Sequence, residues 1–262
     1  MNRNILIFMV DQLNGTLFPD GPADWLHAPN LKRLAARSTR FKRAYTASPL
    51  CAPARASFIS GQLPSATRVY DNAAEFTSSI PTYAHHLRRG GYQTCLTGKM
   101  HFVGPDQLHG FEERLTTDIY LADFGWTLDY RRHGERIEWW YHNLGSVTGA
   151  GIGETSNQLE YDDEVAYHAT RKLYDLAREE DVRPWCLTVS FTHPHDPYVA
   201  RKKYWDLYDA SKIEISKYQQ DSENGPSIAY HSSGELRSYI CLLYTSDAAD
   251  EGLGVDLGGR RI

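Results

Sequence analysis

Short apolar runs alternate with helix-like segments along the chain, and this alternation limits the fold more than any other feature of the sequence. Continuous apolar runs are typical of strands that a parallel sheet buries on both faces. Segments that begin with Pro or end at Gly, with apolar residues three or four apart, predict the intervening helices. Strands are expected at residues 4–10, 92–97 and 185–192, and helices at 29–37, 81–89 and 161–179. The pattern predicts a three-layer α/β fold, with a mostly parallel sheet and helices on both faces.

Polar residues directly follow three of the expected strands. Asp11 comes after the first strand, Lys99 and His101 after the second, and His193 after the third. In folds of this class, ligands gather at the carboxyl ends of the strands. These four residues are therefore candidates for a functional site.

Composition narrows the classes of function. With 41% hydrophobic and 23% charged residues, the 262-residue chain has the composition of an ordinary globular protein. The formal net charge is −5 and the pI is near 6.1. Nucleic-acid binding needs a basic surface, which this balance does not favour, so nucleic acid is not an expected partner.

Targeting signals and cysteine usage favour a cytoplasmic enzyme. The first apolar run, residues 5–10, is too short for the core of a signal peptide, and no apolar stretch is long enough to span a bilayer. The four cysteines are widely spaced and form no Cys-x-x-Cys pair, so neither a zinc cluster nor a disulfide framework is expected. They are Cys51, Cys95, Cys186 and Cys241.

A cysteine motif with the letters CAPAR indicates an anion site. Arg55 follows Cys51 by four residues, which places a fixed cation one helical turn from the sulfur. A helix-compatible run, residues 56–59, comes next and ends at Gly61. The start of a helix offers unpaired backbone N–H groups to an anion. A cysteine-dependent phosphatase is disfavoured, because its loop needs five residues between Cys and Arg and this motif has three.

The segment CAPARASFISG resembles the signature of the type I sulfatases, Cys-x-Pro-x-Arg followed by a Gly. The resemblance extends from Asn2 to about Ile240 and implies the alkaline-phosphatase-like fold of that family. In the family, the motif cysteine is oxidised to formylglycine, and its hydrated aldehyde attacks sulfur. The resemblance therefore implies that Cys51 is the precursor of the nucleophile and that Arg55 belongs to the catalytic site. It also implies a maturation enzyme as a partner.

Further site residues follow from the same resemblance. Asp11 and Gln12 resemble the metal-binding pair of the family, and together with the modified Cys51 they would hold one divalent cation. Oxygen ligands suit a hard ion, and Ca²⁺ is expected, with Mg²⁺ and Mn²⁺ as alternatives. Lys99 and His101 resemble the pair that contacts sulfate and formylglycine.

The proton donor and the substrate pocket also follow from the resemblance. His193 resembles the histidine near the leaving oxygen. The run GKMHFVGPDQLHGFEERLTTDIY, with ADFGWT behind it, looks most like choline sulfatases. A trimethylammonium group is best held by aromatic faces, and the resemblance selects Trp126 and His142 for the choline side. It selects Asn72 as a polar contact near the sulfate.

The end of the sequence differs from the rest. From about Cys241, the letters CLLYTSDAADEGLGVDLGGRRI show no apolar period and match the in-frame reading of a transposase adapter. We expect an incomplete N-terminal catalytic domain at residues 1–240 and a non-native tail at residues 241–262. A flexible native C-terminus is the alternative. Because sulfatases complete their metal site with later residues, this 262-residue chain is expected to be inactive, and contacts of a homo-oligomer could lie in the missing part.

Three functions remain open at this point. The first is a choline sulfatase that releases choline and sulfate. The second is a phosphonate monoester or phosphodiester hydrolase of the same superfamily, which substrate profiling would separate from the first. The third is a non-catalytic binding module in which Cys51 stays a thiol, which mass spectrometry of the Cys51 peptide would reveal.

Overall fold

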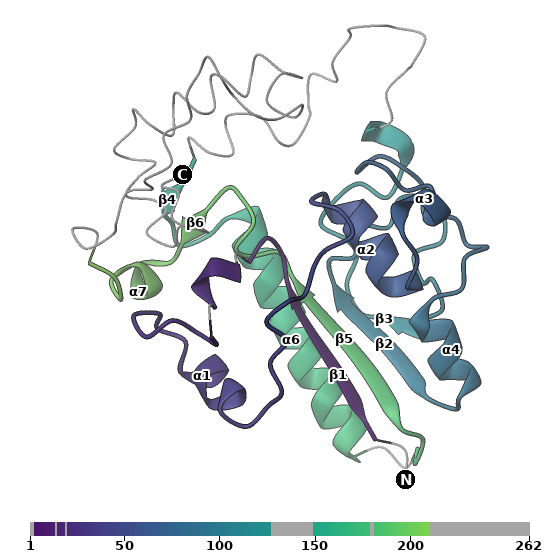
Figure 1. Cartoon of the computed structure of the whole chain (residues 1–262), viewed down its shortest axis with the longest axis horizontal. Coiled ribbons are helices and arrows are strands. Elements are labelled where there is room, and N and C mark those ends of the chain that lie inside the picture. The colour runs from purple at the N-terminus through teal and green to yellow at the C-terminus, as the bar shows by residue number, and fades with distance from the viewer. Residues whose placement is uncertain (1–2, 14, 19, 127–148, 179–180, 210–262) are drawn as a thin grey trace, which may run out of the picture. The chain divides into compact units, whose positions relative to one another are not determined.

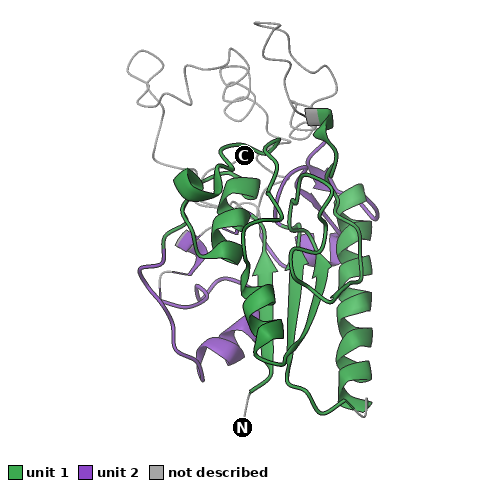
Figure 2. Cartoon of the chain, turned by 90° about the vertical axis from the view of Figure 1, so that its right-hand side faces the viewer, with its two compact units in different colours: residues 1–11, 45–140, 157–193 green, residues 12–44, 141–156, 194–262 purple. Residues whose placement is uncertain are grey.

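The structure is a computed structural model that describes residues 3–13, 15–18, 20–126, 149–178 and 181–209. It separates into two compact units (Figure 2). Unit 1 contains Met1–Asp11, Tyr45–Trp140 and Asn157–His193. Unit 2 contains Gln12–Ala44, Tyr141–Ser156 and Pro194–Ile262.

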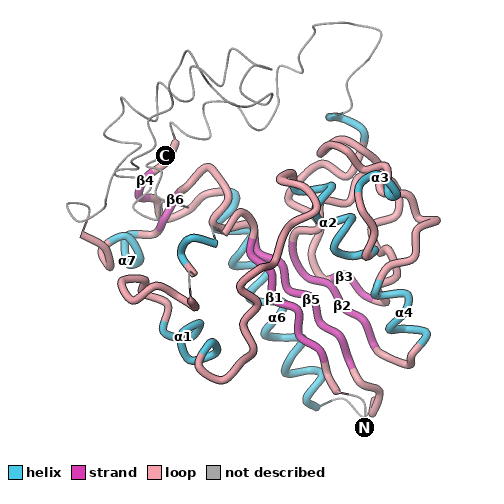
Figure 3. The backbone as a smooth tube through the Cα atoms, in the orientation of Figure 1, coloured by secondary structure: helices cyan, strands magenta, loops and turns pink. Residues whose placement is uncertain are grey.

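In its described residues, unit 1 is built on a parallel sheet of four strands. The strands are β1 (Ile5–Val10), β2 (Gln93–Gly98), β3 (Glu113–Arg114) and β5 (Trp185–Phe191). Their order across the sheet is β1-β5-β2-β3 (Figures 1 and 3). In the register, Cys186 of β5 lies between Ile5 of β1 and Thr94 of β2. The three strands predicted from sequence are confirmed, and the last of them lies between the other two.

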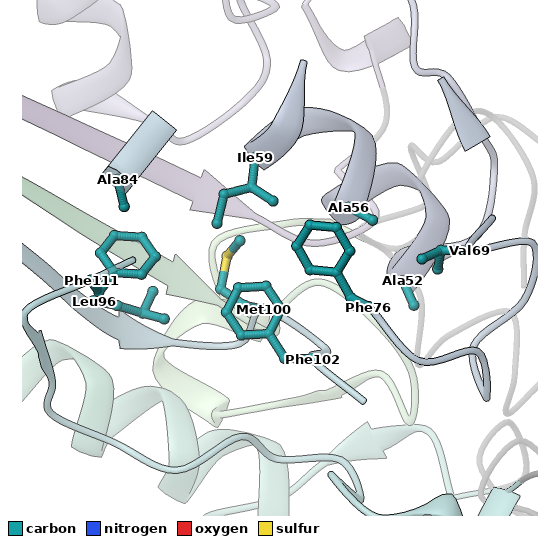
Figure 4. Close-up of a cluster of buried hydrophobic side chains, with 10 residues drawn as sticks. All are labelled: Ala52, Ala56, Ile59, Val69, Phe76, Ala84, Leu96, Met100, Phe102 and Phe111. Carbon is teal, nitrogen blue, oxygen red and sulfur yellow. The ribbon is translucent and has the colours of Figure 1, made fainter. Parts of the chain in front are cut away.

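Helices cover both faces of this sheet. Among the described residues, the helices of unit 1 are α2 (Cys51–Ser60), α3 (Pro64–Thr67), α4 (Tyr83–Arg89) and α6 (Asn157–Arg178), with a 3-10 turn, η2, at Phe124–Trp126. Side chains on a strand point alternately to its two faces. Accordingly Cys95 packs with Val165 of α6, whereas Leu96 packs in a cluster with Ile59 of α2 and Ala84 of α4 (Figure 4). The predicted three-layer α/β fold is confirmed.

The two strands β5 and β1 differ in burial. In β5, the residues from Cys186 to Ser190 are all buried, as expected for a strand with a layer on each side. In β1, Leu6, Phe8 and Val10 are 51%, 60% and 37% exposed, and they alternate with half-buried neighbours. The prediction that β1 is buried on both faces is therefore wrong for the part of the chain that the structure describes. Its physical reason is that β1 lies at the edge of the described sheet, and one of its faces is uncovered there.

Local sequence explains where the helix α4 begins and ends. Thr82 is its N-cap, and its side chain accepts a hydrogen bond from the backbone N–H of His85. In return, the His85 ring accepts a hydrogen bond from the Thr82 N–H, which completes a capping box. Gly90 is the C-cap, and Gly91 follows with a φ of 83°, a backbone conformation that favours glycine. The helix predicted between Pro81 and Gly90 is confirmed.

Unit 2 contains short elements. They are η1 (Gly15–Leu17), α1 (Pro29–Ala35), β4 (Gly151–Ile152), β6 (Val199–Ala200) and α7 (Lys202–Trp205), and β4 pairs with β6 in parallel. The helix predicted from Pro29 is confirmed, but Leu31 and Leu34 on its apolar side are 40% and 51% exposed. Among the described helices, none has the length and apolar character that crossing a membrane requires.

Candidate active site

Four candidate residues of unit 1 follow the ends of β1, β2 and β5, which run parallel and therefore end on the same side of the sheet. They are Asp11, Lys99, His101 and His193. The turn out of β2 depends on Gly98, which has a φ of 102°. A Cβ at Gly98 would lie 1.9 Å from the carbonyl oxygen of Ser190 on β5, so only glycine fits there. The next residue, Lys99, donates its backbone N–H to that same oxygen at 2.9 Å. The close approach places the loop after β2 directly beside the end of β5.

The Cys-x-Pro-x-Arg motif forms the first turns of α2. The sequence predicted a helix only after the motif, from residue 56, whereas the structure begins the helix at Cys51 itself. Proline is tolerated in a first helical turn because the N–H groups there have no partner within the helix. The N-cap residue, Leu50, has no capping side chain. Asn72 takes that role from outside, because its Oδ1 accepts the N–H of Ala52 at 3.0 Å.

Charged side chains gather around the Cys51 sulfur. The Sγ atom lies 3.8 and 4.0 Å from the two carboxylate oxygens of Asp11. Lys99, which is fully buried, pairs with Asp11 and places its Nζ 3.7 Å from Sγ. Arg55 brings a second cation, with Nη2 3.6 Å from Asp11 Oδ2. Two cations against one carboxylate leave this group of four with a surplus positive charge, which an anion would balance.

Arg55 is also part of the framework that holds the strand ends together. Its Nη1 donates to the Lys99 carbonyl oxygen and to Ser190 Oγ, the latter at 2.9 Å. Lys99 follows β2 and Ser190 belongs to β5, so one guanidinium group spans two neighbouring strands. The planar fork of an arginine suits such multiple contacts, which a lysine could not make.

The loop after β2 is fixed by Asp118. Its Oδ2 accepts the backbone N–H groups of Met100 at 2.9 Å and His101 at 2.7 Å. Arg114 pairs with the same oxygen at 2.9 Å. The His101 ring donates from Nε2 to the carbonyl oxygen of Asn72 at 3.1 Å. Burial lowers the pKa of His101 to about 3, against the opposing effect of Asp118, so the ring is neutral near pH 7.

The loop after β5 is fixed by Asp162 of α6. Its Oδ2 accepts the backbone N–H of His193 at 2.9 Å and the ring Nδ1–H at 2.7 Å. Its Oδ1 accepts the backbone N–H and the hydroxyl of Thr192. Burial acts to raise the pKa of Asp162, but these hydrogen bonds hold it below its usual value. Sequence reasoning missed Asp162 and Asp118, because an aspartate 31 residues before or 17 residues after the histidine that it holds carries no motif.

The remaining predicted residues have varied positions. Asn72 lies beside the start of α2, as described above. Gln12 begins unit 2, where its Nε2 donates to the Tyr198 hydroxyl at 2.9 Å. Trp126 ends η2, and His142 lies outside the described residues. The structure thus brings six predicted residues together within unit 1, which are Asp11, Cys51, Arg55, Asn72, Lys99 and His101, and it places His193 after the neighbouring strand β5.

The donor atoms fit a hard divalent cation in part. The Asp11 carboxylate is a suitable ligand for such an ion, and it lies next to Cys51. Gln12 uses its amide nitrogen in the contact with Tyr198, which leaves the amide oxygen as its donor. A thiol suits softer metals, so an oxygen at the Cys51 position would fit a hard cation better than the sulfur does.

Solved structures of other proteins share this fold. A phosphonate monoester hydrolase from Silicibacter pomeroyi aligns with a TM-score of 0.63 and 21% identity, over 98% of this chain and 56% of that chain. One from Agrobacterium radiobacter gives a TM-score of 0.59 at 22% identity, over 85% of this chain and 47% of that chain. At this level of identity the likeness concerns the fold, which is the alkaline-phosphatase-like fold of sulfatases and phosphonate hydrolases.

Sequence relatives are more specific. A choline-sulfatase from Rhizobium meliloti (strain 1021) is 79% identical over 209 residues, which cover 79% of this chain and 41% of the relative. An arylsulfatase from Clostridium perfringens is 29% identical over 224 residues, which cover 79% of this chain and 46% of the relative. The chain thus spans less than half the length of these curated relatives. The sulfatase family model matches residues 3–253, and the chain belongs to the sulfatase family.

Proposed function

We propose that the complete protein hydrolyses choline sulfate to choline and sulfate. The observation that carries this proposal is the 79% identity to the choline-sulfatase of Rhizobium meliloti over 209 residues. The proposal concerns the whole protein, because this chain covers 41% of that relative. The charged cluster around Cys51 supports it, since a sulfate ester is an anion that two buried cations would hold.

Sulfatases generally use a formylglycine and a metal ion, and we assign the formylglycine to Cys51. The modified residue would supply the oxygen nucleophile. Lys99 and Arg55 would hold the sulfate oxygens and stabilise the charge that develops on them. Their positions are fixed before substrate binds, because Lys99 is fully buried and Arg55 is hydrogen-bonded to both strand ends.

The metal site would use Asp11, Gln12 and the modified Cys51. We propose Ca²⁺ as the ion, because carboxylate and amide oxygens are its preferred ligands. Lys99 now pairs with Asp11, so a bound cation and a bound sulfate would each take over one half of that ion pair. Removing the metal with a chelator and restoring activity separately with Ca²⁺, Mg²⁺ or Mn²⁺ would identify the ion.

The histidines would have different roles. His193 would give a proton to the leaving choline oxygen, while the neutral His101 would contact the nucleophile. Trp126 and His142 would lie on the choline side, and Asn72 would hold the start of α2 beside the sulfate. Tryptophan faces attract quaternary ammonium groups, so Trp126→Ala should raise KM for choline sulfate more than it lowers kcat.

Several features of the complete protein belong to the same proposal. Cys51 would need a maturation enzyme, and we propose that residues 1–240 belong to the catalytic domain and that residues 241–262 are a non-native tail. We propose a cytoplasmic location, which the free thiols of Cys51, Cys95 and Cys186 among the described residues support. We also propose a homo-oligomer, which light scattering of the complete protein would test. A disulfide between Cys95 or Cys186 and another residue in the native protein would contradict the location.

The test uses the complete gene, recovered by sequencing across residue 240 and expressed in a host that matures other sulfatases. Mass spectrometry of the Cys51 peptide should show a loss of about 18 Da relative to cysteine. Sulfate release from choline sulfate should exceed hydrolysis of a phenylphosphonate monoester, and Cys51→Ala should abolish it. Faster hydrolysis of the phosphonate would favour the phosphonate monoester hydrolase. An unmodified thiol in that host would favour a non-catalytic module.

A further inference from the structure

The Asp162 carboxylate of α6 accepts four hydrogen bonds from two consecutive residues, Thr192 and His193. Asp162 Oδ1 accepts the Thr192 N–H at 2.7 Å and the Thr192 hydroxyl at 2.8 Å. Its Oδ2 accepts the His193 N–H at 2.9 Å and the ring Nδ1–H at 2.7 Å. Four hydrogen bonds to one charged group fix both the backbone and the ring of His193.

Asp162 is held by a rigid layer rather than by the loop that carries His193. Its neighbour Tyr161 and the next residues on that face of α6, Val165 and Ala169, are buried against β2 and β5. The Tyr161 hydroxyl also donates to the Thr117 carbonyl oxygen at 2.7 Å. Because the helix is anchored independently, the carboxylate can set the orientation of the His193 ring.

The contact decides which ring nitrogen faces a substrate. A carboxylate is an acceptor only, so the proton of a neutral ring is held on Nδ1. The other nitrogen, His193 Nε2, is buried and has no hydrogen-bond partner among the described residues. We propose that Asp162 is the positioning residue of the reaction, which keeps His193 protonated on Nδ1 and presents Nε2 to the leaving oxygen of the ester. This inference rests on the proposed function and gives Asp162 a role that the proposed function did not include.

His193 supplies the proton that the leaving choline oxygen needs. When the bond between sulfur and the leaving oxygen breaks, its electron pair goes to that oxygen, which takes the proton from Nε2 of the His193 imidazolium. The ring becomes neutral and keeps its Nδ1 proton, and Asp162 stays a carboxylate throughout. The lowered pKa of Asp162 agrees with this, because a carboxylate that stays ionised cannot compete for the proton.

The test is Asp162→Asn in the complete, matured protein. An asparagine can still accept from Thr192 through its oxygen, but it turns an NH₂ group toward Nδ1. This disfavours the imidazolium and moves the proton of the neutral ring to Nε2. For choline sulfate, kcat should fall about 100-fold with KM changed less than about threefold. For 4-nitrophenyl sulfate, whose leaving group departs as a stable anion, kcat should fall less than about fivefold, because that reaction needs little help from an acid.

Two controls separate positioning from a general structural effect. Asp163→Asn makes the same change at the exposed neighbouring residue of α6 and should leave both substrates unaffected. In a His193→Ala background, Asp162→Asn should have no further effect on kcat, because residues that act as a unit are not additive. An equal loss on both substrates, no loss on choline sulfate, or additive effects would overturn the inference.

Nuclear magnetic resonance of the unsubstituted protein tests the inference even if the variant does not fold. The ¹⁵N shifts of the His193 ring, assigned with His193→Gln, should report a proton on Nδ1 in the neutral form. A neutral ring protonated on Nε2 would contradict the role of Asp162. The proposed function fails separately, if the matured protein does not hydrolyse choline sulfate at all. In that case the ring tautomer can still be measured.

Discussion

The loops after β2 and β5 are fixed by the same device, but the two carboxylates that fix them differ in what else they touch. Asp118 and Asp162 each accept consecutive backbone N–H groups, at Met100 and His101 in one loop and at Thr192 and His193 in the other. Asp118 also pairs with Arg114, whereas Asp162 also bonds the ring of His193. A loop can therefore be held in the same way whether or not its anchor takes part in chemistry.

The difference extends to how each negative charge is compensated. Burial acts to raise the pKa of both aspartates, and both are nevertheless lowered. For Asp118, the largest opposing effect is the charge of Arg114. For Asp162, it is the hydrogen bond from the His193 ring. Changes at Asp118 should therefore appear mainly in stability, and changes at Asp162 mainly in turnover.

Gly98→Ala should have the largest effect, because it breaks the frame that both loops share. The new Cβ would lie 1.9 Å from the Ser190 carbonyl oxygen, and the φ of 102° is unfavourable for alanine. We expect a loss of more than about 4 kcal/mol in the free energy of unfolding and little folded protein. Gly61→Ala is the control, because its φ is 68° with no atom within 4 Å of the new Cβ, and about 1 kcal/mol is expected. Similar urea midpoints for the two variants would contradict the prediction.

Asp118→Ala should cost about 3–5 kcal/mol in the free energy of unfolding, measured with urea. The change leaves Arg114, whose side chain is 7% exposed, without its ion-pair partner, and it removes the acceptor of two backbone N–H groups. Asp118→Asn keeps an acceptor for those groups and should cost less. If Asp118→Ala is no more destabilising than the same change at the exposed Asp123, Asp118 does not anchor its loop.

His109→Phe should distinguish the contribution of His109 to acid unfolding from the contributions of Asp118 and Asp162. The His109 ring is fully buried, with its centroid 4.5 Å from that of Phe76 and 4.3 Å from that of Phe102. Burial lowers its pKa to about 4, against the opposing effect of Asp106. Because the pKa of His109 in the folded state is below the usual histidine value of 6.5, the stability from neutral His109 is complete above pH 6.5 and is lost as the pH falls toward 4.

The phenylalanine variant should therefore lose less stability over this pH window, by about 2 kcal/mol. Urea unfolding at a series of pH values measures the difference. The carboxylates of Asp118 and Asp162 have lowered pKa values, so their contributions are present above the usual value of 3.8 and are lost only below it. Parallel stability curves for the variant and the original between pH 6.5 and 4 would show that His109 is not the cause.

Thr192→Val should have the smallest effect. It tests Asp162 Oδ1, the carboxylate oxygen that does not bond His193. It removes the hydroxyl that donates to Oδ1 at 2.8 Å, while the backbone N–H of the same residue remains bonded. We expect a loss of about 1 kcal/mol in unfolding free energy, with kcat for choline sulfate within about threefold. A much larger fall in kcat would mean that the orientation of His193 depends on both oxygens of Asp162.

The framework of the site could be predicted from the sequence, but its anchors could not. Apolar runs located β1, β2 and β5, and the residues directly after them, such as Asp11 and Lys99, followed from strand polarity. The spacing of Cys51 and Arg55 predicted an anion site, and their catalytic roles followed from the resemblance to the sulfatase signature. The roles of Asp118 and Asp162 could not be predicted, because each binds residues that are distant in the sequence. In the sequence alone, a single aspartate cannot be distinguished from an ordinary surface aspartate.

The burial of individual elements was also beyond the sequence. Leu6 and Phe8 belong to an apolar run that is typical of a strand buried on both faces. Their exposure depends on which elements pack against β1. The start of α2 at Cys51 was missed because its cap comes from Asn72, a residue 20 positions later. Local sequence specifies what an element is, whereas its neighbours decide where it begins and what covers it.

The position of β5 between β1 and β2 sets a time scale for the proposed maturation of Cys51. Neither Asp11 nor Lys99 can take its final place beside the thiol until the last residue of β5, Phe191, has been synthesised. That residue lies 140 positions after Cys51. At roughly 5–20 residues per second, translation of this stretch takes about 7 to 28 s. During that interval the sulfur, which charged side chains later surround, belongs to an unassembled segment that the proposed maturation enzyme would reach.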